Sequence, residues 1–185
     1  MTIQLSDSEL LIQFRSVDTK AREESFTIIM QRYQQRLYWH IRRMVIDHDD
    51  ANDILQNVFI RVWKSLNGFR EDSQLFTWLY RIATNESITF LNKKRKHIFV
   101  SVQDVNNELK NKLTTQGNFS ENKTELKLQE AILTLPQKQR VVFNLRYYDE
   151  MPYEEMSRVL ETSEGALKAT FHHAVKKVES YLLNH

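Results

Sequence analysis

Aromatic, basic and amide side chains gather on one edge of a helix predicted over 76–92. Trp78, Arg81 and Asn85 lie on that edge, and the helix runs into a cluster of four cations at 93–96. Such groups can stack on unpaired bases and hydrogen-bond to them, which makes this edge a candidate single-strand binding surface. The alternative is a helix packed on both sides, with Trp78 buried and the cations at a solvated helix end that suits the helix dipole.

A second candidate surface lies near the C-terminus, where a short helix, a turn and a longer helix follow one another. The helices are predicted over 152–160 and from Ser163 onward, an order typical of a helix-turn-helix. Small Gly165 and Ala169 on the outward face permit close approach to a DNA groove, and Lys168 can reach phosphates. A plain three-helix bundle with a solvated face of lysines and histidines is the alternative interpretation.

The helix predicted over 51–66 presents an apolar residue within a polar outward face. Ile60 lies among Asp53, Gln56 and Asn57, away from the stripe of apolar residues that faces the core. One exposed isoleucine is common on protein surfaces. An isoleucine ringed by acidic and amide groups is also typical of a protein docking surface, and the two interpretations carry equal weight at this point.

Several classes of chemistry are disfavoured by what the sequence lacks. The 185 residues include no cysteine, no phosphate-binding loop, no nucleophile elbow and no zinc-protease motif. The adjacent His172 and His173 project about 100° apart on a helix, which does not suit joint chelation of a metal. We therefore expect a protein without catalytic residues, cofactor or metal site.

Targeting and membrane signals are also missing from the sequence. The N-terminus has no basic region followed by an apolar core, and no apolar run approaches the roughly 20 residues that span a bilayer. The formal net charge is +2, with its sharpest basic cluster at 93–96. We expect a cytoplasmic protein that is not inserted in a membrane.

The elements that must position these surfaces are all predicted to be helices. The chain has 3 glycines and 2 prolines, fewer than turn-rich β folds need. Apolar residues recur with helical spacing over 26–44, 51–66 and 76–91, and again over 137–182. A further short helix is predicted over 7–16, capped by Ser6 or Asp7. No segment alternates with a period of two, so the fold class is all-α.

The middle of the chain differs in composition from both ends. Residues 101–128 are rich in Asn, Ser, Thr, Lys and Gln and poor in large apolar residues. This composition predicts a flexible linker, partly helical at its end, between two small helical domains over 1–100 and 129–185.

The segments 50–96 and 135–182 resemble region 2 and region 4 of bacterial sigma factors. Their order and spacing resemble the extracytoplasmic-function (ECF) group of the sigma-70 family. The resemblance implies that 1–100 is a region 2 helical bundle that docks on core RNA polymerase and melts the −10 promoter element. It implies that 129–185 is a region 4 helix-turn-helix that reads the −35 element as duplex.

Matching the motifs residue by residue assigns three surfaces. The implied core-polymerase-binding residues are Asp53, Gln56, Asn57, Ile60 and Arg61. The implied −10 DNA-binding residues are Phe69, Arg70, Ser73, Gln74, Trp78, Arg81, Asn85, Asn92, Lys93, Lys94, Arg95 and Lys96. The implied −35 DNA-binding residues are Ser163, Glu164, Gly165, Lys168, Ala169, His172, His173 and Lys176.

The family resemblance also implies a function and a set of partners. The function is transcription initiation, by directing core RNA polymerase to specific promoters. The partners are the β′ coiled coil and β flap of the polymerase, promoter DNA, and an anti-sigma factor of the kind that is often membrane-bound. We expect the protein itself to be a monomer. A stand-alone helix-turn-helix regulator and a sigma-like decoy that sequesters an anti-sigma factor are the alternatives.

Two glutamates depart from the family pattern at turns. Glu71 replaces a common glycine in the loop that captures a flipped base, and Glu161 replaces the usual glycine of the helix-turn-helix turn. The turn at Glu161 must avoid a positive φ or bear its cost, because a side chain disfavours that conformation.

Overall fold

The computed structural model describes residues 5–98 and 123–184, and over these two ranges the chain is helical and contains no strand. The all-α prediction is therefore confirmed. Most of the predicted linker falls outside the described residues. Its last part, from Lys123 on, belongs to a helix of the second unit.

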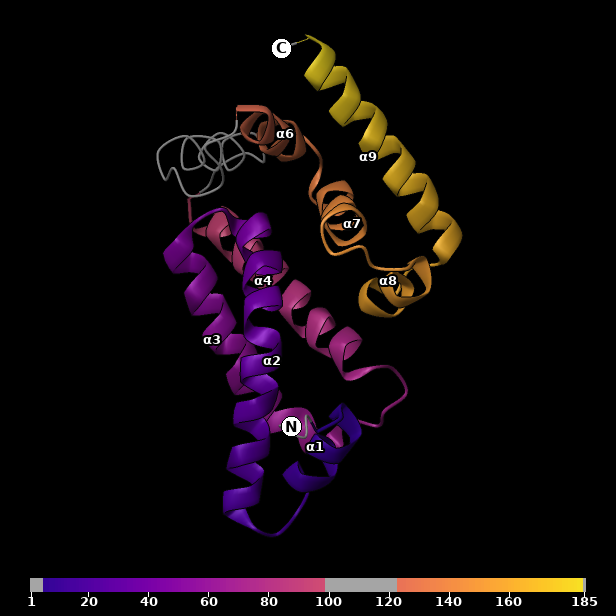
Figure 1. Ribbon diagram of the computed structural model, residues 1–185. Coiled ribbons are helices and arrows are strands. Elements are labelled where there is room, and N and C mark those ends of the chain that lie inside the picture. The colour runs from indigo at the N-terminus through magenta and orange to yellow at the C-terminus, as the bar shows by residue number, and fades with distance from the viewer. Residues whose placement is uncertain (1–4, 99–122, 185) are drawn as a thin grey trace.

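The first unit is a bundle built around one long helix (Figure 1). α2 packs against α1, α3 and α4, and α3 also packs against α4. The elements are α1 (Asp7–Phe14), α2 (Thr19–Val45), α3 (His48–Ser65), the 3-10 helix η1 (Leu66–Gly68) and α4 (Leu75–Ile98). Each buries the apolar stripe that its helical spacing predicts, including Ile41 of α2 and Val58 of α3.

Local capping determines where these helices begin. The side chain of Ser6 accepts from the backbone N–H of Glu9, while the Glu9 carboxylate accepts from the backbone N–H of Ser6. Asp18 caps α2 and Asp47 caps α3 in a simpler manner, in which the carboxylate accepts from backbone N–H groups of the first turn. The predicted cap at Ser6 is thus confirmed.

The second unit holds four helices, with α9 lying across the other three. They are α6 (Lys123–Leu133), α7 (Gln137–Tyr147), α8 (Tyr153–Leu160) and α9 (Glu164–Asn184). Pro136 and Pro152 occupy the N-cap positions of α7 and α8, where a missing N–H costs nothing. Phe143, Ala174 and Val178 belong to the apolar cluster that joins α9 to α6 and α7.

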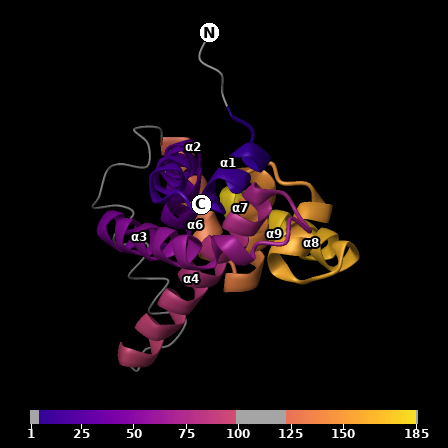
Figure 2. The ribbon, with the colours of Figure 1, turned by 90° about the horizontal axis from the view of Figure 1, so that it is seen from below.

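The two units pack against each other. α8 lies on α4 and α7 contacts α2. Seen from below, α3 and α8 lie on opposite sides of the molecule (Figure 2). One core cluster runs from Leu37 and Leu79 of the first unit to Val142, Met156 and Leu167 of the second. The described parts of the chain thus share a continuous apolar core.

The end of α3 is extended by one 3-10 turn. A glycine just beyond the end of a helix often takes the left-handed conformation. The chain instead continues from α3 into η1, and Gly68 does not have a positive φ. The 3-10 turn provides a hydrogen bond for the carbonyl of Leu66, the residue that follows α3, because the backbone N–H of Phe69 donates to it.

Candidate functional site

The outward face of α3 has the composition expected of a docking surface. Asp53, Gln56, Asn57, Ile60 and Arg61 are all exposed. Ile60 is 47% exposed, whereas the other isoleucine of α3, Ile54, is buried. The predicted set therefore forms one accessible strip with an apolar residue within it.

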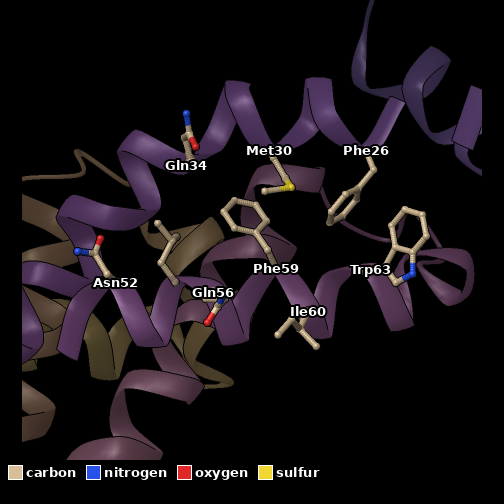
Figure 3. A pocket seen from close by; sticks show the side chains of 9 residues that line it. Phe26, Met30, Gln34, Asn52, Gln56, Phe59, Ile60 and Trp63 are labelled. Atoms are coloured by element: carbon tan, nitrogen blue, oxygen red, sulfur yellow. The ribbon is translucent and has the colours of Figure 1, made fainter. Parts of the chain in front are cut away.

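An apolar cavity lies beside this strip, between α2 and α3. It measures about 450 Å³. Figure 3 shows Phe26, Met30, Phe59 and Trp63 gathered along it, with Ile60 at its edge. The ring of Phe26 packs edge-on against that of Trp63, with 4.9 Å between centroids. The cavity offers a partner apolar surface next to the polar strip, a feature that the sequence pattern alone did not indicate.

The loop between η1 and α4 is held from both sides. On one side the ring of Phe69 is buried and packs on Trp78, with 5.0 Å between centroids. On the other side Arg15, at the end of α1, donates to the Glu71 carboxylate at 2.7 Å and to the Phe69 carbonyl at 2.5 Å. Glu71 has a φ of 62° and therefore takes the left-handed conformation. Arg70 and Gln74 of the same loop are exposed, and Ser73 is half-buried.

The predicted single-strand surface on α4 is only partly accessible. Asn85 and Lys93 are exposed, while Trp78 and Asn92 are half-buried. Lys94 forms an ion pair of 3.4 Å with Asp50, and the side chains of Arg95 and Lys96 lie outside the described residues. The ring of Trp78 packs against that of Phe69 and is half-buried, so this residue is neither fully buried nor freely exposed.

Acidic residues of the second unit bind the N-terminal half of α4. The guanidinium of Arg81 pairs with the carboxylate of Glu161. The hydroxyl of Thr77 donates to the carboxylate of Glu155. Arg81 is one of the predicted −10 residues, and Glu161 is in the turn of the helix-turn-helix. One residue of the predicted −10 surface is therefore in contact with the unit predicted to read the −35 element, although its side chain stays 47% exposed.

Asp149 is the most buried acidic group of this interface. Its side chain is 6% exposed, and its Oδ2 lies 3.0 Å from Nδ1 of the fully buried His40. Arg43 lies 3.4 Å from the other oxygen, to which the Tyr80 hydroxyl also donates. Burial, and then the Asp149 charge, raise the pKa of Tyr80, so the phenol stays protonated and can donate. His40 is fully buried, and its pairing with Asp149 across the interface is a contact that local sequence patterns do not indicate.

The helix-turn-helix has the geometry that its sequence predicts. Glu161 ends α8 with φ 50° and ψ 43°, so the turn takes the left-handed conformation and bears its cost. The Ser163 hydroxyl accepts from the backbone N–H of Ala166 at 3.4 Å and caps α9. The eight predicted −35 residues are all exposed: Ser163, Glu164, Gly165, Lys168, Ala169, His172, His173 and Lys176. Leu167, Ala174 and Val178 on the opposite side are buried.

Metal and membrane features were sought over the same residues. Within 5–98 and 123–184 no three His, Asp or Glu side chains are grouped as a metal site would require. Across these ranges, no helix combines the length and the apolar character that crossing a bilayer demands.

Comparison with known proteins decides the family. The model of Sigma-70 region 2 matches residues 29–97, and that of Sigma-70 region 4 matches 125–178. The ECF RNA polymerase sigma factor SigW of Bacillus subtilis is 30% identical over 173 residues, which cover 89% of this chain and 92% of SigW. The chain belongs to the ECF sigma factors. This sigma factor is therefore a transcription initiation factor that works with RNA polymerase, and the stand-alone regulator is the weaker interpretation.

Other relatives are similar to this sigma factor over nearly their whole length. RNA polymerase sigma-H factor of Pseudomonas aeruginosa is 26% identical, covering 98% of this chain and 96% of its own. ECF RNA polymerase sigma-E factor of Escherichia coli is 28% identical, covering 97% and 96%.

Two solved structures have a similar fold. The sigma factor RpoE, in complex with the anti-sigma factor NepR from Bartonella quintana, has a TM-score of 0.67 at 19% identity, covering 86% of this chain and 97% of that one. CnrH, in complex with the cytosolic domain of CnrY, has a TM-score of 0.65 at 22% identity, covering 94% of each chain. At these identities the likeness concerns the fold alone.

Proposed function

We propose that the three surfaces divide promoter-directed initiation among them. The outward face of α3 docks on the β′ coiled coil of core RNA polymerase. The 69–74 loop and the adjoining edge of α4 capture the separated strand of the −10 element. The outward face of α9 enters the major groove of the −35 element, while the second unit also touches the β flap.

The observation that carries this proposal is the exposure of Ile60 within the α3 strip, next to the apolar cavity. An apolar side chain left accessible among Asp53, Gln56 and Asn57 stabilises a complex more than it stabilises the free chain. A partner helix that covers Ile60 can also fill the neighbouring cavity. The charged rim would then set the register of the partner.

The −10 role is supported by the kinds of group around the loop. Flipping a base out of its stack costs a few kcal/mol, which stacking and hydrogen bonds in the pocket must offset. Trp78, half-buried and backed by the buried ring of Phe69, supplies an aromatic surface, and Gln74 of the loop and Asn85 of α4 supply exposed amides. The basic segment at 93–96 continues the helix and can follow the phosphates.

The packing of the second unit on α4 adds a condition to this role. DNA that binds Arg81 must displace the carboxylate of Glu161, and Thr77 is buried beneath Glu155. Separation of the two units would free both residues, and binding to polymerase and promoter would then favour the separated state. A sigma factor that reads two elements of one promoter needs the same separation.

The −35 role is supported by the shape of the α9 face. Gly165 and Ala169 leave room for the helix to approach base edges, while Lys168 and Lys176 can reach phosphates on either side. Lys168 already lies beside Glu164 and over the ring of Tyr153, so it is directed along the outward face.

The further partners and the location follow from this role. An anti-sigma factor, such as the solved complex of RpoE contains, would hold this sigma factor inactive. The protein would act as a monomer in the cytoplasm, where the polymerase is, without a cofactor or metal and without a catalytic residue of its own.

Chemical probing of one promoter tests the assignment of surfaces. With core polymerase and this protein, thymines of the −10 element become reactive to permanganate and the −35 duplex becomes protected from hydroxyl radicals. Lys168→Ala weakens the −35 protection on all sequences alike and lowers the salt dependence of binding by about one counterion. An exposed lysine elsewhere, Lys20→Ala, serves as the control and leaves both signals unchanged. Equal −35 protection by the Lys168 variant contradicts the role of α9.

A further inference from the structure

The 69–74 loop contains a residue in a conformation that its side chain disfavours. Glu71 has a φ of 62°, which glycine adopts freely and glutamate does not. A strained backbone persists where surrounding contacts hold it. The contacts of Glu71 therefore show what keeps this loop in place.

Arg15 makes the contacts that hold the loop. Its Nη1 donates to Oε1 of Glu71 at 2.7 Å, and its Nη2 donates to the backbone carbonyl of Phe69 at 2.5 Å. One planar guanidinium thus binds two points of the loop, two residues apart. Both bonds are charge-assisted, which makes them stronger than bonds between neutral groups.

The helix that carries Arg15 is itself firmly placed. Leu10, Leu11 and Phe14 of α1 are buried in the main core, and the backbone N–H of Arg15 donates to carbonyls of the last turn. α1 lies beside η1 and the start of the loop (Figure 1). Arg15 therefore connects the loop to a rigid element far away in sequence.

The same helix forms one wall of a cavity at the loop. This open cavity measures about 420 Å³, which is within the range of small-ligand sites. Ser8 and Leu11 of α1 line it together with Phe69, Ser73 and Gln74 of the loop segment. Arg158 of α8 also lines the cavity, so the distance between the loop and α1, which Arg15 spans, sets part of its width.

We propose that Arg15 is a positioning residue, which holds the 69–74 loop against α1 in the shape that receives the captured −10 base. The inference rests on the proposed −10 role of the loop. An ordinary exposed ion pair contributes little. The Arg15 contacts differ because they hold a strained residue and a backbone carbonyl in one short loop.

Hydrogen exchange of the full-length protein tests whether Arg15 holds the loop. Arg15→Ala raises amide exchange within 70–75 by about fivefold to tenfold, because the open state of the loop becomes more populated. Arg15→Lys restores part of the protection, since one ammonium keeps the charge but not the planar fork. Lys20→Ala removes a cation from an exposed pair on α2 and is the control. Unchanged exchange in Arg15→Ala overturns the proposal.

Discrimination among bases tests whether the held shape matters for capture. The complex with core polymerase is titrated with single-stranded −10 oligonucleotides that carry each of the four bases at the captured position. Arg15→Ala lowers the ratio of best to worst affinity by about fivefold, while binding to core and to the −35 duplex is unchanged. Adding Glu71→Gln to Arg15→Ala lowers it little further, because the two residues act as a pair.

The outcomes separate this inference from the function on which it rests. If the wild-type complex shows no base preference at all, the −10 role of the loop fails and the inference fails with it. If wild type and Arg15→Ala discriminate equally well, the −10 role stands and the positioning role of Arg15 is overturned.

Discussion

Arg81 of α4 is paired with Glu161, the residue that ends α8 in the turn of the helix-turn-helix. One contact thus joins a residue proposed to touch the −10 strand to the element proposed to read the −35 duplex. Around it lie Thr77 with Glu155 and His40 with Asp149, so the contact belongs to a packed interface. In this arrangement the second unit packs directly on the helix that carries the proposed −10 residues.

A reversible cross-link tests whether this packing weakens −10 binding. Ile88 and Lys138 line one cavity at the interface, and the chain has no native cysteine to compete. Ile88→Cys with Lys138→Cys, joined by a short thiol-cleavable bis-maleimide, should bind a single-stranded −10 oligonucleotide severalfold more weakly, because the second unit stays packed on α4 and Glu161 stays paired with Arg81. Cleavage of the link should restore the affinity of the unlinked double variant. Equal binding before and after cleavage contradicts the need for separation.

Ile60→Glu should lower affinity for core RNA polymerase about tenfold or more, since it buries a charge where an apolar contact forms. Competition with a labelled sigma factor for core polymerase measures the effect. The matched control is Ile12→Glu, because Ile12 is an isoleucine of α1 that is 69% exposed and outside the proposed docking strip. If the Ile60 variant competes as well as wild type, the docking surface lies elsewhere.

Asn85→Ala should abolish open-complex formation while polymerase binding survives. Asn85 is exposed on α4, so its loss removes hydrogen bonds to the separated strand without disturbing the core. Permanganate reactivity of the −10 element reports strand opening, and native gels report the complex with core. Gln35→Ala, an exposed amide on α2, should leave both unchanged. Normal strand opening in the Asn85 variant would remove this residue from the −10 surface.

Glu161→Gly should stabilise the protein by about 0.5–1 kcal/mol, because glycine takes the observed φ of 50° without steric cost. The lost pair with Arg81 involves two exposed side chains and offsets little of this gain. Thermal unfolding measures the change. Glu154→Gly places glycine inside the first turn of α8, where it should destabilise instead. A lower melting temperature for Glu161→Gly would show that the turn carries no strain.

The helices and most of their ends could be predicted because their signals are local. Apolar spacing, the Ser6 cap and the positions of Pro136 and Pro152 act within one or two turns of chain. The start of α2 at Thr19 and the end of α4 at Ile98 were placed less well, because their outer turns carry few of the spaced apolar residues from which the helices were predicted.

The surfaces were predictable in composition but not in accessibility. Ile60 and the α9 face are exposed as a helical projection requires. The contacts between the second unit and α4 could not be predicted from local patterns. They depend on Glu155 and Glu161, which are far from Thr77 and Arg81 in the sequence. The ion pair of Arg15 with Glu71 could not be predicted either, because the two residues are far apart in the sequence. Only the unusual glutamate in that turn was apparent from the sequence.

Promoter-directed transcription with purified bacterial core RNA polymerase tests the central claim most directly. The template is the DNA upstream of this protein's own coding sequence together with a panel of ECF-type promoters, and reactions are run with and without the protein. A discrete transcript that depends on the protein, and that Ile60→Glu and Asn85→Ala each reduce, is the predicted result. Binding to core polymerase without any protein-dependent transcript from any template would contradict the account and favour a decoy that sequesters an anti-sigma factor.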